Sequence, residues 1–227
     1  MEVKLQIIVE GQIEQIFVEQ ILTPHLHSLG IICFCHVIPT KVNEKTYRGG
    51  GRSYTLIDRD ISRTLGYQSH YVTTMFDLYA LPHDTPGKEG LSPDDSGSRK
   101  VKVIETALER KIDNIRFIPY IQLHEFEALL FSHIEKIDEV MTLREDSHID
   151  TLQRILHEAR EPENINDNPN TAPSKRLLSL YPSYKKTLDG AQIFNKIPLS
   201  RIRAQCPHFD TWITRLEQLA PQNGDSL

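Results

Sequence analysis

The chain has 227 residues, of which 39% are hydrophobic and 25% are charged, and its formal net charge is −5. This composition is typical of a globular protein and excludes a disordered or fibrous chain, while the negative charge argues against a protein that coats nucleic acid through bulk electrostatics. No apolar run approaches the roughly 20 residues that span a bilayer, and no basic region leads into an apolar segment at the N-terminus. We therefore expect a cytoplasmic protein outside the membrane. The three cysteines form no CxxC pair, so free thiols are expected.

The first 130 or so residues alternate between strand and helix patterns. The predicted strands are Lys4–Val9, Ile31–Pro39, Tyr71–Phe76 and Ile115–Ile121. The predicted helices are Ile13–Leu22, ending at Pro24, then Tyr54–Leu65, Ser98–Ile112 and one that begins at Phe126. The polar segments 41–53 and 78–97, both rich in glycine or proline, are predicted loops. This alternation indicates βαβ units, and hence a Rossmann-like, mostly parallel sheet flanked by helices.

Beyond about Asp138 the strand pattern disappears. Amphipathic helical stretches remain at 149–159, 174–180 and 209–219, and the segment 161–171, rich in Asn, Asp and Pro, is a candidate linker. We therefore predict an α/β core at residues 1–137 and a helical C-terminal extension at 138–227 that packs on the core.

Three of the predicted strands end in carboxylates. Glu10 follows the first strand, Asp77 follows the third, and the fourth leads into the segment 124–127, His-Glu-Phe-Glu. In a parallel sheet these ends lie at one edge, where ligands bind. Clustered carboxylates usually share a cation or act as an acid/base pair, and oxygen ligands favour Mg²⁺ or Mn²⁺ over zinc. Glu10 and Asp77 are the leading candidates, because a charge at the end of a buried strand needs a partner; for Glu14, a solvated helix position is an equal alternative.

The segment IIVEGQIEQIFVEQIL resembles the first motif of Toprim domains, in which a Glu at the end of the first strand precedes a Gly turn and a helix. With the segments RGGGRSY, TTMFDLYALP, IPYIQLHEFEALLFS, TAPSKRLLSLYPSYKKTLDG and CPHFDTWI, nearly the whole chain resembles an uncharacterised bacterial family of Toprim-like proteins, domain of unknown function 4276. The resemblance implies a Toprim-like fold. It also implies a site where a Glu and a DxD pair position Mg²⁺ for phosphodiester chemistry.

Carried over to this sequence, the resemblance assigns the Glu to Glu10 and the first Asp to Asp77, but Tyr79 stands where the second Asp is expected. The missing carboxylate then has to come from Glu125 or Glu127, and we favour Glu127. On a helix these two would face away from each other, so only one is expected to ligate unless the backbone is extended there. His124 is a candidate general acid/base, with a hydrogen-bonded structural role as the alternative.

A basic stretch between Thr171 and Arg203 is the candidate nucleic-acid contact. Its main candidates are Lys175, Arg176, Lys185 and Lys186, interleaved with Tyr181 and Tyr184, which would suit phosphate contact with base stacking. A solvated helical face is the alternative.

Arg48 and Arg52 flank a triple glycine, an arrangement that lets backbone amides and guanidinium groups reach a phosphate together. Because the loop lacks the Lys-Ser/Thr ending of a nucleotide-binding P-loop, we do not expect an ATP site there. An unoccupied loop is an equal alternative.

These patterns predict a Mg²⁺- or Mn²⁺-dependent nuclease subunit that acts on nucleic acid. The predicted catalytic residues are Glu10, Asp77, Glu125, Glu127 and His124, of which Glu10, Asp77 and Glu127 are the metal ligands. The family resemblance implies an ATPase partner of the SMC or ABC type in phage-defence or mobile-element systems. Two alternatives remain: a regulatory module that binds metal or nucleotide without cleaving, and a structural adaptor.

Overall fold

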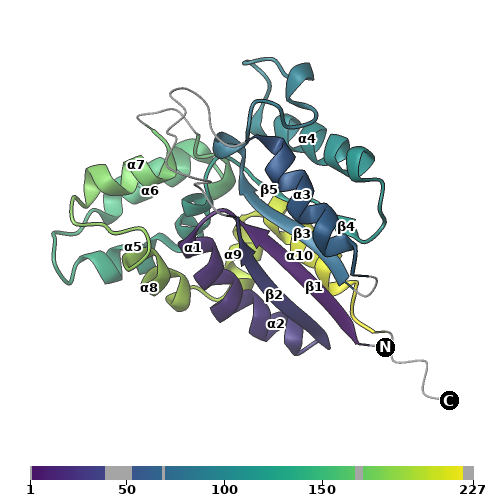
Figure 1. The fold of residues 1–227 in the computed structure, drawn as a ribbon. Helices are drawn as coiled ribbons and strands as arrows, with labels where there is room; N and C mark the ends of the chain where they lie inside the picture. The colour runs from purple at the N-terminus through teal and green to yellow at the C-terminus, as the bar shows by residue number, and fades with distance from the viewer. Residues whose placement is uncertain (1, 39–52, 68–69, 167–170, 222–227) are drawn as a thin grey trace, which may run out of the picture.

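A parallel sheet lies at the centre of the molecule (Figure 1). The structure, a computed structural model, describes residues 2–38, 53–67, 70–166 and 171–221. In this part of the chain the strands lie in the order β2-β1-β3-β4, and a short β5 pairs with β3 beyond β4. The strands are β1 (Val3–Val9), β2 (Ile31–Val37), β3 (His70–Asp77), β4 (Phe117–Ile118) and β5 (Ile121–Gln122), and all the pairings are parallel. The expected sheet flanked by helices is confirmed.

The central strand β1 is covered on both faces. Ile7, Ile8 and Val9 are all fully buried although successive side chains point to opposite faces. Ile8 belongs to one apolar core and its two neighbours to another. A continuous apolar run is what a parallel strand between two helical layers requires.

Two helices cover the front face in Figure 1. Helix α3 (Tyr54–Leu65) packs on β3, and α4 (Gly97–Ile112) packs on β4 and β5. Helix α3 begins where predicted, because the Ser53 side chain accepts a hydrogen bond from the Thr55 N–H at 3.3 Å and caps the helix.

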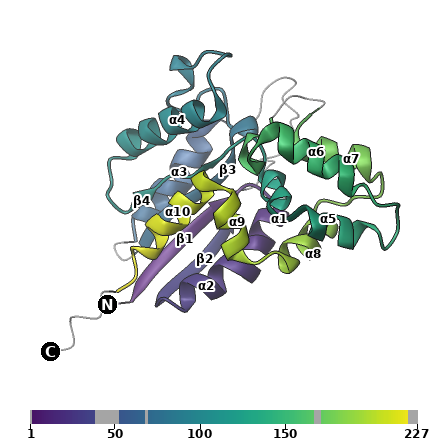
Figure 2. The same cartoon turned by 180° about the vertical axis from the view of Figure 1, so that it is seen from behind.

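Helices from both ends of the chain cover the back face (Figure 2). The N-terminal ones are α1 (Gln12–Phe17), a π-helical turn (Val18–Leu22) and α2 (Thr23–His27). The C-terminal ones are α9 (Leu199–Gln205) and α10 (Pro207–Glu217). The Trp212 Nε1 in α10 donates a hydrogen bond to Thr73 Oγ1 in β3 at 2.8 Å. The C-terminal helix therefore packs directly on the sheet, and residues from both sides of position 137 share one apolar core.

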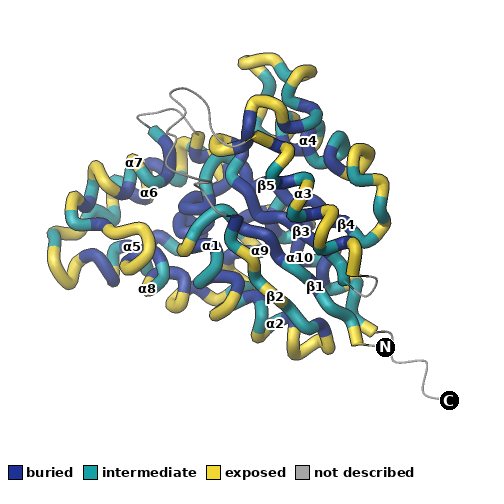
Figure 3. Tube along the Cα trace, in the orientation of Figure 1, coloured by how far each residue is buried: buried dark blue, intermediate teal, exposed yellow. Residues whose placement is uncertain are grey.

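A further group of helices lies on the side towards which β1 runs, at the left of Figure 1. It consists of α5 (Ile134–Met141), α6 (Ile149–Ala159), α7 (Pro173–Leu180) and α8 (Asp189–Lys196). The buried residues form a continuous band from the sheet into this group (Figure 3). The helices thus close over the carboxyl ends of the strands.

Five sequence predictions of local structure need correction. The first helix does not end at Pro24, because the π-helical turn places this proline in the first turn of α2, where its missing N–H is tolerated. The fourth strand is interrupted by Pro119 into β4 and β5, and the segment that begins at Phe126 is a 3₁₀ helix (Phe126–His133). The loop 78–97 contains two 3₁₀ turns, Leu78–Ala80 and Lys88–Gly90. The predicted linker contains another, Pro162–Asn164, with buried Glu163.

Among the described helices, none has the length and apolar character needed to cross a bilayer.

Candidate functional site

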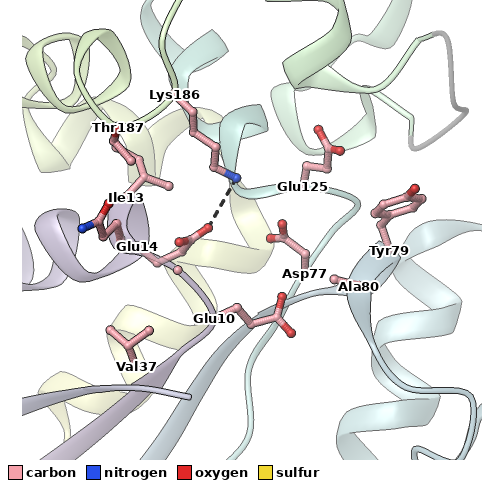
Figure 4. A pocket seen from close by; sticks show the side chains of 12 residues that line it. Glu10, Ile13, Glu14, Val37, Asp77, Tyr79, Ala80, Glu125, Lys186 and Thr187 are labelled. Carbon is pink, nitrogen blue, oxygen red and sulfur yellow. Dashed lines mark ion pairs between the residues drawn. The ribbon is translucent and has the colours of Figure 1, made fainter. Parts of the chain in front are cut away.

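Glu10 and Asp77 both lie at the carboxyl edge of the sheet. The register pairs Val9 of β1 with Met75 of β3, so Glu10 follows directly at the end of one strand and Asp77 ends its neighbour. Both half-buried side chains line a cavity of about 750 Å³ (Figure 4). The predicted convergence of strand ends therefore brings these two carboxylates to one cavity.

A tight glycine turn brings a third carboxylate to this cavity. A Cβ atom at Gly11 would lie 2.8 Å from Glu14 Oε2, so a larger residue there would displace the end of the Glu14 side chain. The chain then enters α1, whose first turn holds Glu14, with 4% of the residue exposed. A carboxylate in the first turn of a helix is stabilised by the free backbone N–H groups. Glu14 is thus a buried wall residue of the site and not a solvated helix residue.

Lys186 reaches the cavity from the opposite side. Its Nζ lies 3.0 Å from Glu127 Oε1 and 3.7 Å from Glu14 Oε1, the latter contact being dashed in Figure 4. Burial alone would lower the pKa of Lys186, but the negative charges of Glu127, Glu14 and Asp77 outweigh it and raise the pKa. Lys186 is therefore a charged ammonium that bridges the sheet edge and the helical group.

The segment that carries Lys186 is held at several points. The fully buried Asp189 carboxylate accepts hydrogen bonds from the Lys185 backbone N–H at 2.7 Å and from Arg144 Nη2 at 2.6 Å. Just before it, the Ser183 backbone N–H donates to Glu145 Oε1 at 2.8 Å. These bonds fix the backbone between α7 and α8. The Lys186 side chain therefore enters the cavity from a rigid segment.

Burial and neighbouring charge raise the pKa of two carboxylates in this site. Burial raises the pKa of Asp77, Glu14 raises it further, Lys186 opposes this, and Glu10 and Glu127 add to the increase. Burial likewise raises the pKa of Glu127, against the opposing charge of Lys186. Glu14 Oε2 is buried and accepts no hydrogen bond from the described residues. Burial and the neighbouring carboxylates thus disfavour the charged form of Asp77, and a cation bound beside it would favour that form.

The segment after β5 separates the other predicted catalytic residues. Glu125 is extended (φ −133°, ψ 151°), lines the cavity, and accepts a hydrogen bond from the Ser174 backbone N–H at 3.1 Å. Glu127 is fully buried behind Lys186. His124 has a left-handed backbone (φ 60°), and its ring packs where a Cβ of Gly97 would be 2.9 Å from Nε2. Of the predicted catalytic residues, Glu10, Asp77 and Glu125 thus line the cavity. Glu127 contacts Lys186, which lines it, and His124 is not among the lining residues.

Only part of the predicted basic surface reaches this site. Lys186 lines the cavity, Lys175 and Lys185 are exposed, and Arg176 donates from Nε to the Thr171 carbonyl at 2.7 Å. Tyr181 and Tyr184 are buried, 0% and 6% exposed, so the expected base stacking on these two rings is wrong. Both tyrosines stabilise the helical group instead. Arg48 and Arg52 lie outside the described residues.

Comparisons with known proteins place the sequence in a family. Residues 9–217 match the family described as Domain of unknown function (DUF4276). The chain belongs to this family. No curated protein matches the sequence significantly.

The solved structures that are similar include two C-terminal regions of OLD proteins. The region from Burkholderia pseudomallei has 16% sequence identity and a TM-score of 0.47, and the match covers 97% of this chain and 100% of that chain. The region from Xanthomonas campestris pv. campestris, phased with mercury, has 17% identity and a TM-score of 0.42, with 93% and 96% covered.

Sequence reasoning did not assign the central role that Lys186 has in this site. In the sequence it is one of several cations in a basic stretch, and its contacts with Glu14 and Glu127 span 172 and 59 positions. The signal in the sequence was Asp189, the only acid among the basic residues between Thr171 and Arg203. In the structure this residue is fully buried. A buried carboxylate fixes nearby backbone, which indicates that the neighbouring lysine is held in place.

Proposed function

We propose that this chain is a Mg²⁺- or Mn²⁺-dependent nuclease subunit that cleaves phosphodiester bonds of nucleic acid. The observation that carries the proposal is the pair of carboxylates, Glu10 and Asp77, at the ends of neighbouring strands, facing one cavity that Lys186 also lines. The resemblance of the surrounding motifs to Toprim domains supports the same chemistry.

The donor set fits a hard divalent cation. Mg²⁺ is usually held by one or two carboxylates, with water and substrate phosphates completing its coordination. Among the described residues, no group of three or more acidic, histidine or cysteine side chains is arranged to hold a metal ion alone. We therefore propose that Glu10 and Asp77 hold the ion together with water and the substrate phosphate, and Glu125 on the same cavity wall is the next candidate. We no longer favour Glu127 as a ligand, because Lys186 already neutralises its buried carboxylate. The bound ion would supply an activated water and stabilise negative charge on the phosphate.

The residues of the chain itself would bind and orient the phosphate. The Lys186 ammonium has three donors, and its contacts with Glu127 and Glu14 leave capacity for a phosphate oxygen in the cavity. Glu127 and Glu14 position Lys186, and keep it protonated. The exposed side chains of Lys185 and Lys175 would guide the strand towards the cavity through phosphate contacts.

A regulatory module is the second candidate function. The Lys186 ammonium already compensates part of the acidic cluster, and Tyr79 occupies the place of a second ligand, so the cavity could bind metal without cleaving. In either case we propose, from the family resemblance, that an ATPase of the SMC or ABC type is the partner, in a phage-defence or mobile-element system.

Cleavage assays separate the two candidates. Single- and double-stranded DNA and RNA would be incubated with the protein and Mg²⁺ or Mn²⁺, with and without a candidate ATPase of the SMC or ABC type. A nuclease cleaves at least one substrate, and Asp77→Asn removes this activity, whereas the exposed control Asp94→Asn retains it. Metal binding with no cleavage under any of these conditions would favour the regulatory module.

A further inference from the structure

An exposed aromatic ring stands beside the acidic cavity. Tyr79 lines the cavity, and the residue is 60% exposed. It lies in the 3₁₀ turn Leu78–Ala80, and its backbone N–H donates to the His124 carbonyl at 3.3 Å. The flanking residues Leu78 and Leu81 are buried and anchor the turn. The ring is therefore presented to solvent from a fixed backbone.

The position of this ring relative to Asp77 limits what it can contact. Two residues separate their Cα atoms by at most about 7 Å, so a phosphate held at Asp77 leaves its neighbouring nucleotide within reach of the ring. Figure 4 shows the Tyr79 ring beside Glu125 at the same wall of the cavity. An uncharged ring beside a carboxylate offers no strong phosphate contact, but its face is a surface on which a nucleobase can stack.

We propose that Tyr79 is a base-stacking platform that makes this site select single-stranded nucleic acid. This inference rests on the proposed function and specifies its substrate. In a duplex, both faces of an internal base are covered by its neighbours, and a protein ring can stack only on a base that is unpaired or has left the stack. The ring takes the place of the second metal-binding carboxylate, so the residue that departs from the Toprim pattern determines the specificity of the site.

The chain contains a matched control for this residue. Tyr67 is 58% exposed, but it lies just before β3, at the opposite end of this strand from Asp77, with its ring 5.6 Å from that of His70. Tyr67→Ala removes a comparable exposed ring without touching the cavity. Tyr79→Phe keeps the stacking face and removes only the hydroxyl group.

Binding of labelled oligonucleotides, followed by fluorescence anisotropy, tests the proposal. Ca²⁺ replaces Mg²⁺ to prevent turnover, and the probes are a short single strand, its duplex, and a strand of the same length made of abasic nucleotides. We expect Tyr79→Ala to weaken single-strand binding roughly tenfold, with Tyr79→Phe and Tyr67→Ala close to the wild type. Binding of the duplex and of the abasic strand should not change in Tyr79→Ala.

Several results would overturn the proposal. One is an affinity of Tyr79→Ala for the single strand equal to that of the wild type, and another is an equal loss of affinity in Tyr79→Phe or Tyr67→Ala. The proposal also fails if Tyr79→Ala loses as much affinity for the abasic strand or the duplex as for the single strand, or if the wild type binds no oligonucleotide. The outcome is separable from that of the proposed function. Cleavage that depends on Asp77 but not on Tyr79 would refute the stacking role alone, whereas Tyr79-dependent binding without any cleavage would refute the nuclease alone.

Discussion

Replacing Lys186 with methionine should destabilise the fold, because it leaves buried carboxylates without their cation. Methionine preserves the length and the apolar stem of the side chain. The Glu127 side chain is 1% exposed, and the Lys186 Nζ lies 3.0 Å from its Oε1. Breaking a buried ion pair by removing one partner costs about 3–5 kcal/mol. The Lys186 side chain is 44% exposed, so solvent screening reduces this, and we expect a loss of about 2–3 kcal/mol.

Urea unfolding at neutral pH measures this loss directly. In a chain of this size each kcal/mol lowers Tm by about 2–4 °C, so a thermal scan provides a second measurement. Lys185→Met is the matched control, since its exposed side chain should contribute within about 0.5 kcal/mol. In the Glu127→Gln background, Lys186→Met should cost less than half as much, because the buried charge is gone and Glu14 is the one described carboxylate left within 4 Å of Nζ. A Lys186→Met variant as stable as the wild type, or one equally destabilised in both backgrounds, would refute the assigned contacts.

Two further predictions concern the metal and pH. Mg²⁺ at 100 times its Kd should stabilise the fold by about 2.7 kcal/mol and so raise the Tm. Glu10→Gln should abolish this rise in Tm, and the control Asp94→Asn should keep it. An unchanged rise in Glu10→Gln would exclude Glu10 as a ligand. His208 Nε2 lies 3.1 Å from both Glu105 Oε1 and the Ile121 carbonyl, in a pocket with Glu163 and the stacked Tyr120 ring. Burial lowers the pKa of His208, but the bond and charge of Glu105, with Glu163 and the Ile121 carbonyl, raise it overall. The resulting stability should be complete below pH ~6.5 and lost as the pH rises through the pKa of the folded state, so His208→Gln should flatten the decline of unfolding free energy with pH. An equal decline in the variant would contradict this role.

The fold followed from sequence where local signals and tertiary packing agree. The bounds of α3 were predicted because periodicity coincides with the Ser53 cap, and β1 was predicted because its apolar run ends at a charge and a glycine. The break between β4 and β5 could have been read from Pro119, which has no N–H for the ladder. There the Thr74 hydroxyl group accepts a hydrogen bond from the Tyr120 N–H and donates one to the Tyr120 carbonyl, in place of backbone bonds between the strands. The spacing of apolar residues does not reveal such a side-chain contact.

The short helices α8 and α9 were not predicted. Each has only seven or eight residues, too few for the apolar spacing to stand out, and packing against the rest of the chain stabilises such short helices.

The site was predictable only up to its strand ends. Glu10 and Asp77 share an edge because parallel strands share a direction, which is a property of sequence order. The burial of Glu14 and the approach of Lys186 depend on how the helical group packs over that edge, and this packing involves residues far apart in sequence. The same holds for Tyr181, which the sequence presents among cations but whose hydroxyl group donates to Asp138 inside the helical group.

The rate of phosphodiester cleavage by Asp77→Asn relative to the wild type tests the central claim most directly. Both proteins would be purified in parallel, with Asp94→Asn as a third sample, and assayed on the best substrate with saturating Mg²⁺ or Mn²⁺ and the proposed ATPase partner present. The proposed site predicts that the rate falls by several orders of magnitude in Asp77→Asn alone, because loss of a metal ligand removes both water activation and charge stabilisation. Equal cleavage by all three proteins would contradict the assignment of the reaction to this cavity.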